Sequence, residues 1–173
     1  PAMAEARMAA AEDREDSAIV VTGSRVARLS RNLRGDWNAC TVNDPNRSLA
    51  GCRNLVDPAA TGPAGRAAAR LADGLSLAWR GDNDGAIAAF DQAIALQPRL
   101  AFAWLNRGLA HERLGDLDRA IADLDRAVRY APGAARGYYN RSLLLRQRGD
   151  TRRARADQSR AVDLDLRYGA VVR

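Results

Sequence analysis

The sequence predicts an all-α fold, an α-solenoid of three helix pairs that follows an irregular N-terminal extension. One observation is a Gly-Asp pair that recurs every 34 residues, at 81–82, 115–116 and 149–150. A second is a set of alanines in the same phase, at positions 86, 120 and 154 and again at 93, 127 and 161. Periods of roughly 20 to 50 residues are typical of stacked repeats, and about three copies are needed to bury a continuous core.

Each copy divides into two helical halves. In the second copy, Phe102, Leu105 and Leu109 fall at helical spacing before the Gly-Asp pair interrupts the pattern. A second apolar stripe then follows, and Pro132 ends it because proline cannot continue a helix. We therefore predict a repeat domain over 66–173, with copies at 67–100, 101–134 and 135–168.

The residues at the repeated positions resemble those of the tetratricopeptide repeat (TPR) family. The second copy carries the resemblance at Trp104, Gly108, Ala120, Leu124, Ala127 and Pro132. The first copy matches at Gly74, Ala86, Phe90, Ala93 and Pro98, and the third at Tyr138, Ala154 and Ala161. The third copy departs at Ser142, Gln158 and Leu166, which suits a terminal repeat that faces solvent on one side. The resemblance implies a protein-binding module.

In that family the first helix of each pair lines a concave groove, so the resemblance also implies the groove residues. They are Leu71, Leu75 and Trp79; Phe102, Leu105, Asn106, Leu109 and Arg113; and Arg136, Tyr139, Asn140, Leu143 and Arg146. We expect a groove that is apolar at the first repeat and basic at the third. The amide groups of Asn106 and Asn140 can each hold a peptide backbone, and Arg136 and Arg146 can bind a carboxylate.

Some family members bind the acidic C-terminal tails of chaperones through a clamp of Lys, Asn and Arg. Asn106 matches one clamp position and Arg136 can substitute at another, but Leu71 and Leu75 stand where the clamp needs Lys and Asn. The sequence therefore favours another ligand, an extended segment that is apolar at one end and acidic at the other. An alternative stays open, in which the N-terminal region folds back and fills the groove.

The N-terminal extension over 1–35 contains a strand-like segment with three β-branched apolar residues in a row. This segment, Ile19, Val20, Val21, Thr22, Gly23, Ser24 and Arg25, resembles the TonB box of TonB-dependent outer-membrane receptors of Gram-negative bacteria. The resemblance implies that it adds a strand to the edge of the TonB domain. An ordinary strand, a tail or a self-pairing edge are the alternatives. Arginines at 25, 28, 31 and 34 predict a short basic amphipathic helix next, packed on the repeats, a partner or an anionic surface.

The stretch 36–65 is the least regular part of the chain, with turn residues at 43–46 and a linker marked by Pro58, Gly62, Pro63 and Gly65. Cys40 and Cys52 both lie in it, which indicates a disulfide that stabilises a loop too small to pack by itself. Closing such a loop is worth about 3 kcal/mol. Two free thiols or half a metal site are the alternatives. A disulfide implies an oxidising compartment.

The formal net charge is +6, and residues 135–173 hold ten arginines against four acidic residues. This basic end is either a solvated capping face or a surface for an anionic partner. The sequence has no apolar run long enough to span a membrane. The first residues, Pro1-Ala2-Met3-Ala4, resemble a cloning remnant ahead of a mature N-terminus, so we expect a signal peptide to have been removed.

No phosphate loop, catalytic carboxylate pair or nucleophile elbow is found, and His111 has no catalytic companions, so we expect a protein that is not an enzyme and needs no cofactor or metal. The favoured function is a periplasmic protein-interaction adaptor that binds a peptide or partner segment and engages TonB. The alternatives are a cytoplasmic scaffold of the same fold and a nucleic-acid or anionic-surface binder, which the sequence favours least. Self-association stays open as a further possibility, through apolar residues of the terminal repeat, namely Leu143, Leu144, Leu145 and Val162.

Overall fold

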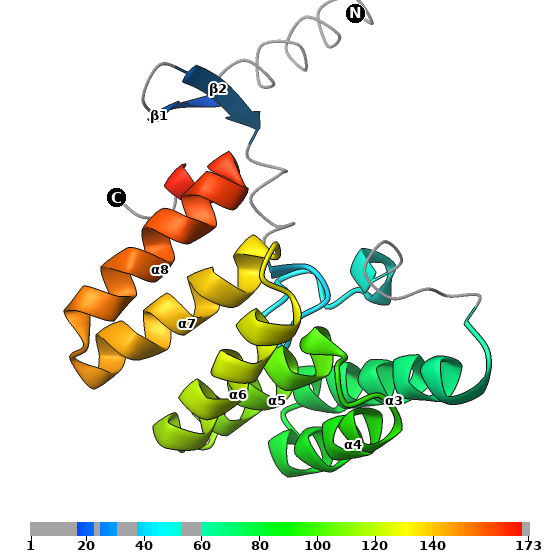
Figure 1. The fold of residues 1–173 in the computed structure, drawn as a ribbon. Helices are drawn as coiled ribbons and strands as arrows, with labels where there is room; N and C mark the ends of the chain where they lie inside the picture. Colours follow the sequence, from blue (N-terminus) through cyan, green and yellow to red (C-terminus); the bar gives the residue numbers. More distant parts are fainter. Residues whose placement is uncertain (1–16, 23–24, 31–37, 53–59, 171–173) are drawn as a thin grey trace, which may run out of the picture.

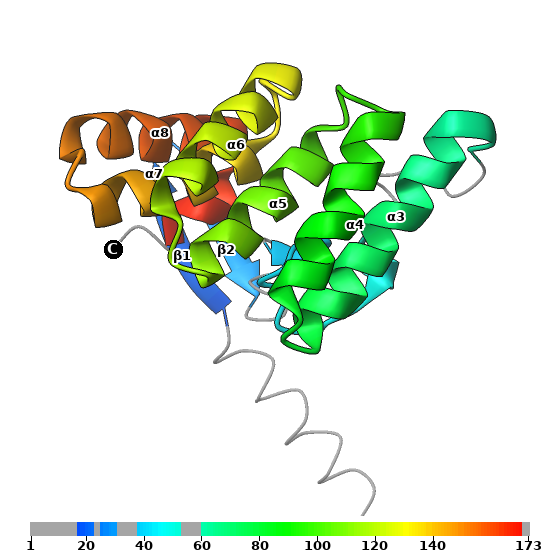
Figure 2. The ribbon, with the colours of Figure 1, turned by 90° about the horizontal axis from the view of Figure 1, so that it is seen from below.

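The computed structural model describes residues 17–22, 25–30, 38–52 and 60–170 (Figure 1). Its helices are α3 (Gly62–Trp79), α4 (Asn83–Leu96), α5 (Ala101–Arg113), α6 (Leu117–Tyr130), α7 (Ala135–Arg148) and α8 (Thr151–Leu164). Each odd-numbered helix packs against the even-numbered helix that follows it, and consecutive pairs stack in a row (Figure 2). The predicted all-α solenoid is therefore confirmed. No helix of the described residues is long and apolar enough to cross a membrane.

The repeated Gly-Asp pair ends one helix of each pair and starts the other. The glycines at 81, 115 and 149 have φ angles of 89°, 81° and 91°, a left-handed conformation that glycine adopts without a steric penalty. The aspartates accept hydrogen bonds from backbone N–H groups three residues on, at 2.8 Å for Asp82, 3.1 Å for Asp116 and 3.1 Å for Asp150. These N-caps satisfy donors that a helix leaves unpaired at its start.

Small residues let the two helices of a pair approach closely. Ala86, Ala120 and Ala154 are buried at this contact, and Phe90 and Leu124 fill the core beside them. Gly74 of α3 lies against the ring of Phe90, which leaves no room for a side chain at that position.

Arginine and aspartate side chains join consecutive repeats, a feature that the sequence prediction missed. Arg107 of α5 donates two hydrogen bonds of 2.8 and 2.7 Å to Asp123 of α6 and one of 2.8 Å to Asp91 of α4. Hydrogen bonding to Asp123 raises the pKa of Arg107 and outweighs the opposing effect of burial. Arg141 makes the same contacts one repeat later, at 2.7, 2.7 and 3.0 Å, with Asp157 and Asp125. The recurrence of these three positions in the sequence was the available signal.

The terminal repeat does not show the solvent-facing pattern that its departures suggested. Ser142 is fully buried, and its hydroxyl donates a 2.6 Å hydrogen bond to the carbonyl of Tyr139. Gln158 is also buried. After α8, a 3₁₀ helix, η3 (Leu166–Ala170), places the ring of Tyr168 4.9 Å from that of Tyr139 between centroids. The chain's own C-terminal segment therefore covers part of the third repeat.

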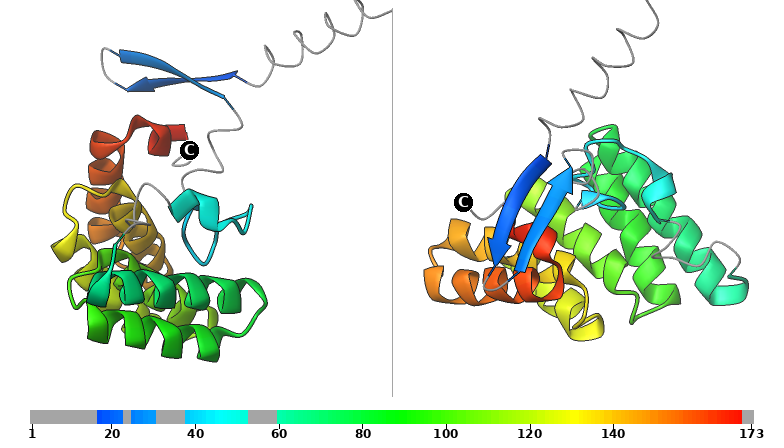
Figure 3. Two further views of the ribbon diagram at one scale, coloured as in Figure 1. Left: turned by 90° about the vertical axis from the view of Figure 1, so that its right-hand side faces the viewer. Right: turned by 90° about the horizontal axis from the view of Figure 1, so that it is seen from above.

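Two strands precede the solenoid, β1 (Ser17–Thr22) and β2 (Arg25–Ser30), paired antiparallel from Ser17 with Ser30 to Thr22 with Arg25. The basic helix predicted from Arg25 onward is thus wrong over Arg25–Ser30, and its remainder, with Arg31 and Arg34, lies outside the described residues. Strand β2 pairs with β1, whose β-branched residues favour a strand, and charge spacing alone does not register this partner. The hairpin lies over the C-terminal end of the solenoid, and β1 contacts η3 (Figure 3).

The predicted linker ends earlier than expected, because α3 begins at Gly62. Pro63 stands in the first turn of this helix, where a missing N–H is not needed. Proline was read as a linker signal, but here it marks a helix start.

Gly74→Ala is expected to lower the free energy of unfolding by about 1–3 kcal/mol, because the added methyl group would overlap the ring of Phe90. Gly133→Ala is the matched control, since a Cβ there would meet nothing within 4 Å. Chemical denaturation followed by circular dichroism measures both variants. Equal stabilities would contradict the close approach of α3 and α4.

Candidate functional site

A loop formed by Asn38–Cys52 packs against the first helices of the repeats, the face that was predicted to hold a peptide (Figure 3). The indole N–H of Trp79 in α3 donates a 3.1 Å hydrogen bond to the carbonyl of Thr41. Cys40 and Val42 are buried in the same apolar cluster as Leu71 and Leu75. A segment that precedes the repeats therefore occupies part of the predicted groove, as one of the alternatives from the sequence expected.

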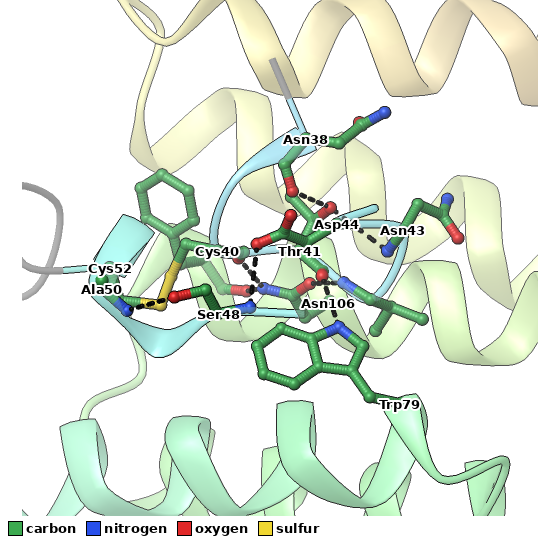
Figure 4. The surroundings of a disulfide bond; sticks show 12 residues. Asn38, Cys40, Thr41, Asn43, Asp44, Ser48, Ala50, Cys52, Trp79 and Asn106 are labelled. Atoms are coloured by element: carbon green, nitrogen blue, oxygen red, sulfur yellow. Dashed lines mark hydrogen bonds between the residues drawn. A yellow bond between two sulfur atoms is a disulfide. The ribbon is translucent and has the colours of Figure 1, made fainter. Parts of the chain in front are cut away.

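Asn106 of α5 holds the main chain of the loop from both sides (Figure 4). Its Oδ1 accepts a 2.8 Å hydrogen bond from the N–H of Val42, and its Nδ2 donates a 3.1 Å hydrogen bond to the carbonyl of Cys40. The second amide hydrogen goes to the carbonyl of Phe102 in its own helix, at 2.9 Å. Asn106 is fully buried, so these bonds satisfy groups that would be costly to leave unpaired.

Arg113, at the end of α5, fastens the loop at a second point. Its guanidinium donates hydrogen bonds of 3.0 Å to the carbonyl of Ala78, 2.8 Å to that of Val42 and 3.2 Å to Oδ1 of Asn43. Burial lowers the pKa of Arg113, the nearby Arg47 lowers it further, and Glu112 opposes the shift. Arg47 and Arg113 line an open cleft of about 380 Å³ between the loop and the solenoid.

The loop is held in a strained shape by its own bonds. A disulfide joins Cys40 and Cys52, as the sequence predicted, with an S–S distance of 2.06 Å. Asp44 is buried and accepts hydrogen bonds from the N–H groups of Asn46, at 2.8 Å, and Ser48, at 3.4 Å. Cys40 and Arg47 adopt positive φ angles of 60° and 48°, which residues other than glycine rarely adopt.

The predicted groove residues fall into three groups. Leu71, Leu75, Leu105 and Leu109 are buried in the core, so they form the floor of the groove. Trp79, Asn106 and Arg113 hold the loop, and the carbonyl of Phe102 accepts a hydrogen bond from the amide of Asn106. The third group is the set on α7: Arg136, Tyr139, Asn140, Leu143 and Arg146.

The residues on α7 make a different set of contacts. Asn140 occupies the position of Asn106 one repeat later and makes the equivalent bond within its helix, 2.9 Å to the carbonyl of Arg136. The guanidinium of Arg136 lies 5.8 Å from the ring centroid of Phe102. Leu143 stays 40% exposed and Arg146 is exposed, whereas Leu144 and Leu145, considered for self-association, are fully buried.

The TonB-box-like segment is divided by the hairpin. Ile19, Val20, Val21 and Thr22 belong to β1, and Arg25 begins β2. Gly23 and Ser24 lie outside the described residues.

Asn106→Ala is expected to destabilise the protein by about 2–3 kcal/mol, because it leaves the N–H of Val42 and the carbonyl of Cys40 without their partner. Hydrogen exchange should show faster exchange of the Val42 amide, and denaturation should show the loss of stability. Asn140→Ala is the matched control, since it removes one bond to its own helix. An unchanged Val42 amide in Asn106→Ala would show that Asn106 does not hold the loop.

The contact between η3 and α7 is expected to weaken at high pH. Burial raises the pKa of Tyr168 to about 12, compared with 10.0 for an exposed tyrosine. Because the folded-state value is the higher one, this group's contribution to stability is complete below about pH 10 and is lost as the pH rises toward 12. Urea unfolding across this range should show a smaller fall for Tyr168→Phe than for the wild type. Parallel curves would contradict this assignment.

Comparisons with known proteins agree with the helical geometry. A family model described as tetratricopeptide repeat matches residues 71–134 and 105–165. The TPR domain of Arabidopsis OM64 is 20% identical, over 64% of this chain and 93% of that chain, with a TM-score of 0.60. The second TPR domain of human RPAP3, in complex with an HSP70 peptide, is 19% identical over 64% and 93%, with a TM-score of 0.59.

The MamA protein is a third similar structure, 21% identical over 76% of this chain and 70% of that chain, with a TM-score of 0.52. At these identities the likeness is one of fold. No curated protein matches the chain in sequence. The family match, in contrast, spans more than half of the sequence, and the chain therefore belongs to the tetratricopeptide repeat family.

Proposed function

We propose that this protein is a non-enzymatic interaction adaptor that binds an extended segment of a partner protein along the face formed by α3, α5 and α7. The observation that carries the proposal is the contact of Asn106 with a main-chain N–H and a main-chain carbonyl. An amide that satisfies both kinds of backbone group binds extended chains with little regard to sequence. The side chains around it then determine which segment is preferred.

The α7 end of this face is the part that we assign to the partner. Asn140 repeats the position of Asn106 but is only 2% exposed, so the exposed residues of α7, Leu143 and Arg146, make the proposed contact. Leu143 offers an apolar contact, and Arg146 offers a charge-assisted hydrogen bond to a carboxylate. We therefore propose a partner segment with an apolar residue followed by acidic ones.

The similar RPAP3 domains were solved with the HSP90 peptide SRMEEVD and the HSP70 peptide SGPTIEEVD. Those ligands support the general idea of an acidic peptide on this fold. They do not transfer directly, because Leu71 and Leu75 of this chain are buried beneath its own loop. We propose a ligand other than a chaperone tail for this reason.

We further propose a periplasmic location and an interaction with TonB through β1. A disulfide between Cys40 and Cys52 favours an oxidising compartment. Strand β1 contains Ile19–Thr22 of the TonB-box-like segment, and among the described residues β2 is the only strand paired with it. The other edge of β1 therefore has main-chain groups that suit the addition of a strand from a partner domain.

The groove proposal predicts that Leu143→Asp and Arg146→Glu each weaken partner binding at least tenfold, about 1.4 kcal/mol. Partners captured from a periplasmic extract by the full chain would be identified by mass spectrometry, and affinities would be measured with the isolated partner. Leu114→Asp and Arg155→Glu are matched controls, since both residues are exposed and neither lies on α7. Equal loss in the controls would reject the α7 end as the binding site.

The TonB proposal predicts that TonB is captured by the full chain and not by a chain without residues 1–30. Both baits should retain partners that bind the groove. TonB captured equally by both baits, or by neither, would remove the proposed role of β1.

A further inference from the structure

We propose that the loop Asn38–Cys52 is an intrachain ligand that closes the first half of the groove, and that reduction of the Cys40–Cys52 disulfide opens this half to a second peptide segment. This inference rests on the proposed adaptor function, because it assumes that the solenoid binds peptides. It adds a latent site and the chemical event that exposes it.

The loop occupies the groove as a bound peptide would. Its main chain contacts three side chains from two helices: Trp79 through the carbonyl of Thr41, Asn106 through Cys40 and Val42, and Arg113 through the carbonyl of Val42. All these bonds use backbone groups of the loop, which every peptide possesses. The contacts can therefore be transferred to another chain without the loss of a specific partner.

The loop's side chains indicate the class of segment that would replace it. Cys40 and Val42 are 0% and 1% exposed and share one apolar cluster with Leu71 and Leu75. Asn43, in contrast, is exposed and accepts a hydrogen bond from Arg113. A replacing segment therefore needs small apolar side chains at two alternate positions and then an acceptor for Arg113.

The disulfide is what keeps the loop in a shape that fits. The described residues of the loop form turns and short 3₁₀ segments, with no α-helix or strand. It also contains Cys40 and Arg47 in the left-handed region, a conformation that an unconstrained chain leaves. Without the covalent bond, the loop would have to pay this conformational cost from its docking contacts alone.

The chemistry of opening is a thiol–disulfide exchange with a dithiol reductant. Cys52 is half-buried and Cys40 is fully buried, so we place the attack at Sγ of Cys52. A thiolate of the reductant forms a mixed disulfide with Cys52, and the thiolate of Cys40 leaves and takes up a proton. The second reductant thiol then displaces Cys52. The protein gains two electrons and two protons, and the reductant becomes a disulfide.

The groove itself should survive the departure of the loop. Trp79 and Asn106 are fixed on α3 and α5, which also pack against α4 and α6. The contact between Arg113 and the carbonyl of Ala78 lies within the solenoid, so this guanidinium stays in place. A site that is rigid without its occupant can bind a second occupant.

The test uses the full chain in three forms: oxidised, reduced with dithiothreitol, and the double variant Cys40→Ala/Cys52→Ala. The probe is a fluorescent peptide with the sequence of residues 38–52, closed between positions 40 and 52 by a thioether that dithiothreitol does not cleave. Fluorescence anisotropy should show binding at least tenfold tighter to the reduced and double-variant forms than to the oxidised form. Hydrogen exchange should show faster exchange of the Val42 amide in the same two forms, with helix amides unchanged.

Two further variants locate the binding. Adding Asn106→Ala to the double variant should abolish probe binding, and adding Arg155→Glu, at an exposed position of α8, should leave it unchanged. Equal affinities for the oxidised and reduced forms would overturn the inference, as would probe binding that is indifferent to Asn106→Ala. A partner that binds the oxidised chain through Leu143 and Arg146, with no probe binding on reduction, would overturn the latent site alone. Failure of both measurements would overturn the adaptor function as well.

Discussion

The structure depends on the close approach of two helices within each 34-residue unit. Alanine at 86, 120 and 154 and glycine at 74 let the backbones come together, so that larger side chains such as Phe90 fill the space beside the contact. This packing fixes the direction of the first helix in every pair. Because the repeats stack with one geometry, equivalent positions such as Asn106 and Asn140 project from the same face. The geometry of the face formed by α3, α5 and α7 thus depends on the small residues beneath it.

On this scaffold, the protein uses one groove for two purposes. The side chains on α3 and α5 hold a loop of the chain itself, through the same kind of backbone contact that would hold a foreign peptide. The side chains on α7 retain an exposed leucine and an exposed arginine. The disulfide closes the loop that occupies the α3 and α5 part of this face. The same face therefore carries the residues proposed to bind a partner and the loop that covers some of them.

The sequence predicted the solenoid and the disulfide because both leave periodic or paired signals. The Gly-Asp pair has a single mechanical meaning wherever it recurs, as a helix end followed by an N-cap. The position of the loop could not be predicted in this way, since the contact between Asn106 and Val42 joins residues 64 apart. The residues from Arg25 were misread as a helix because charge spacing alone does not register a neighbouring strand. Burial of Leu144 and Leu145 depended on helix packing that composition does not encode.

The hydrogen bonds of Arg107 and Arg141 to aspartates form an arginine ladder, which should affect the order in which the repeats unfold. Arg107 joins the first repeat to the second and Arg141 joins the second to the third, each through a carboxylate on both sides. Among the described residues, the ladder has only these two rungs. The position one repeat before Arg107 is Asp73, and the position one repeat after Asp125 is Ser159. The middle repeat thus takes part in both rungs and each outer repeat in one. Because the stability of a repeat array depends on contacts between neighbouring repeats, the outer repeats should unfold before the middle one. Asn106 lies on this middle repeat, so the part of the groove around it should be the last to unfold.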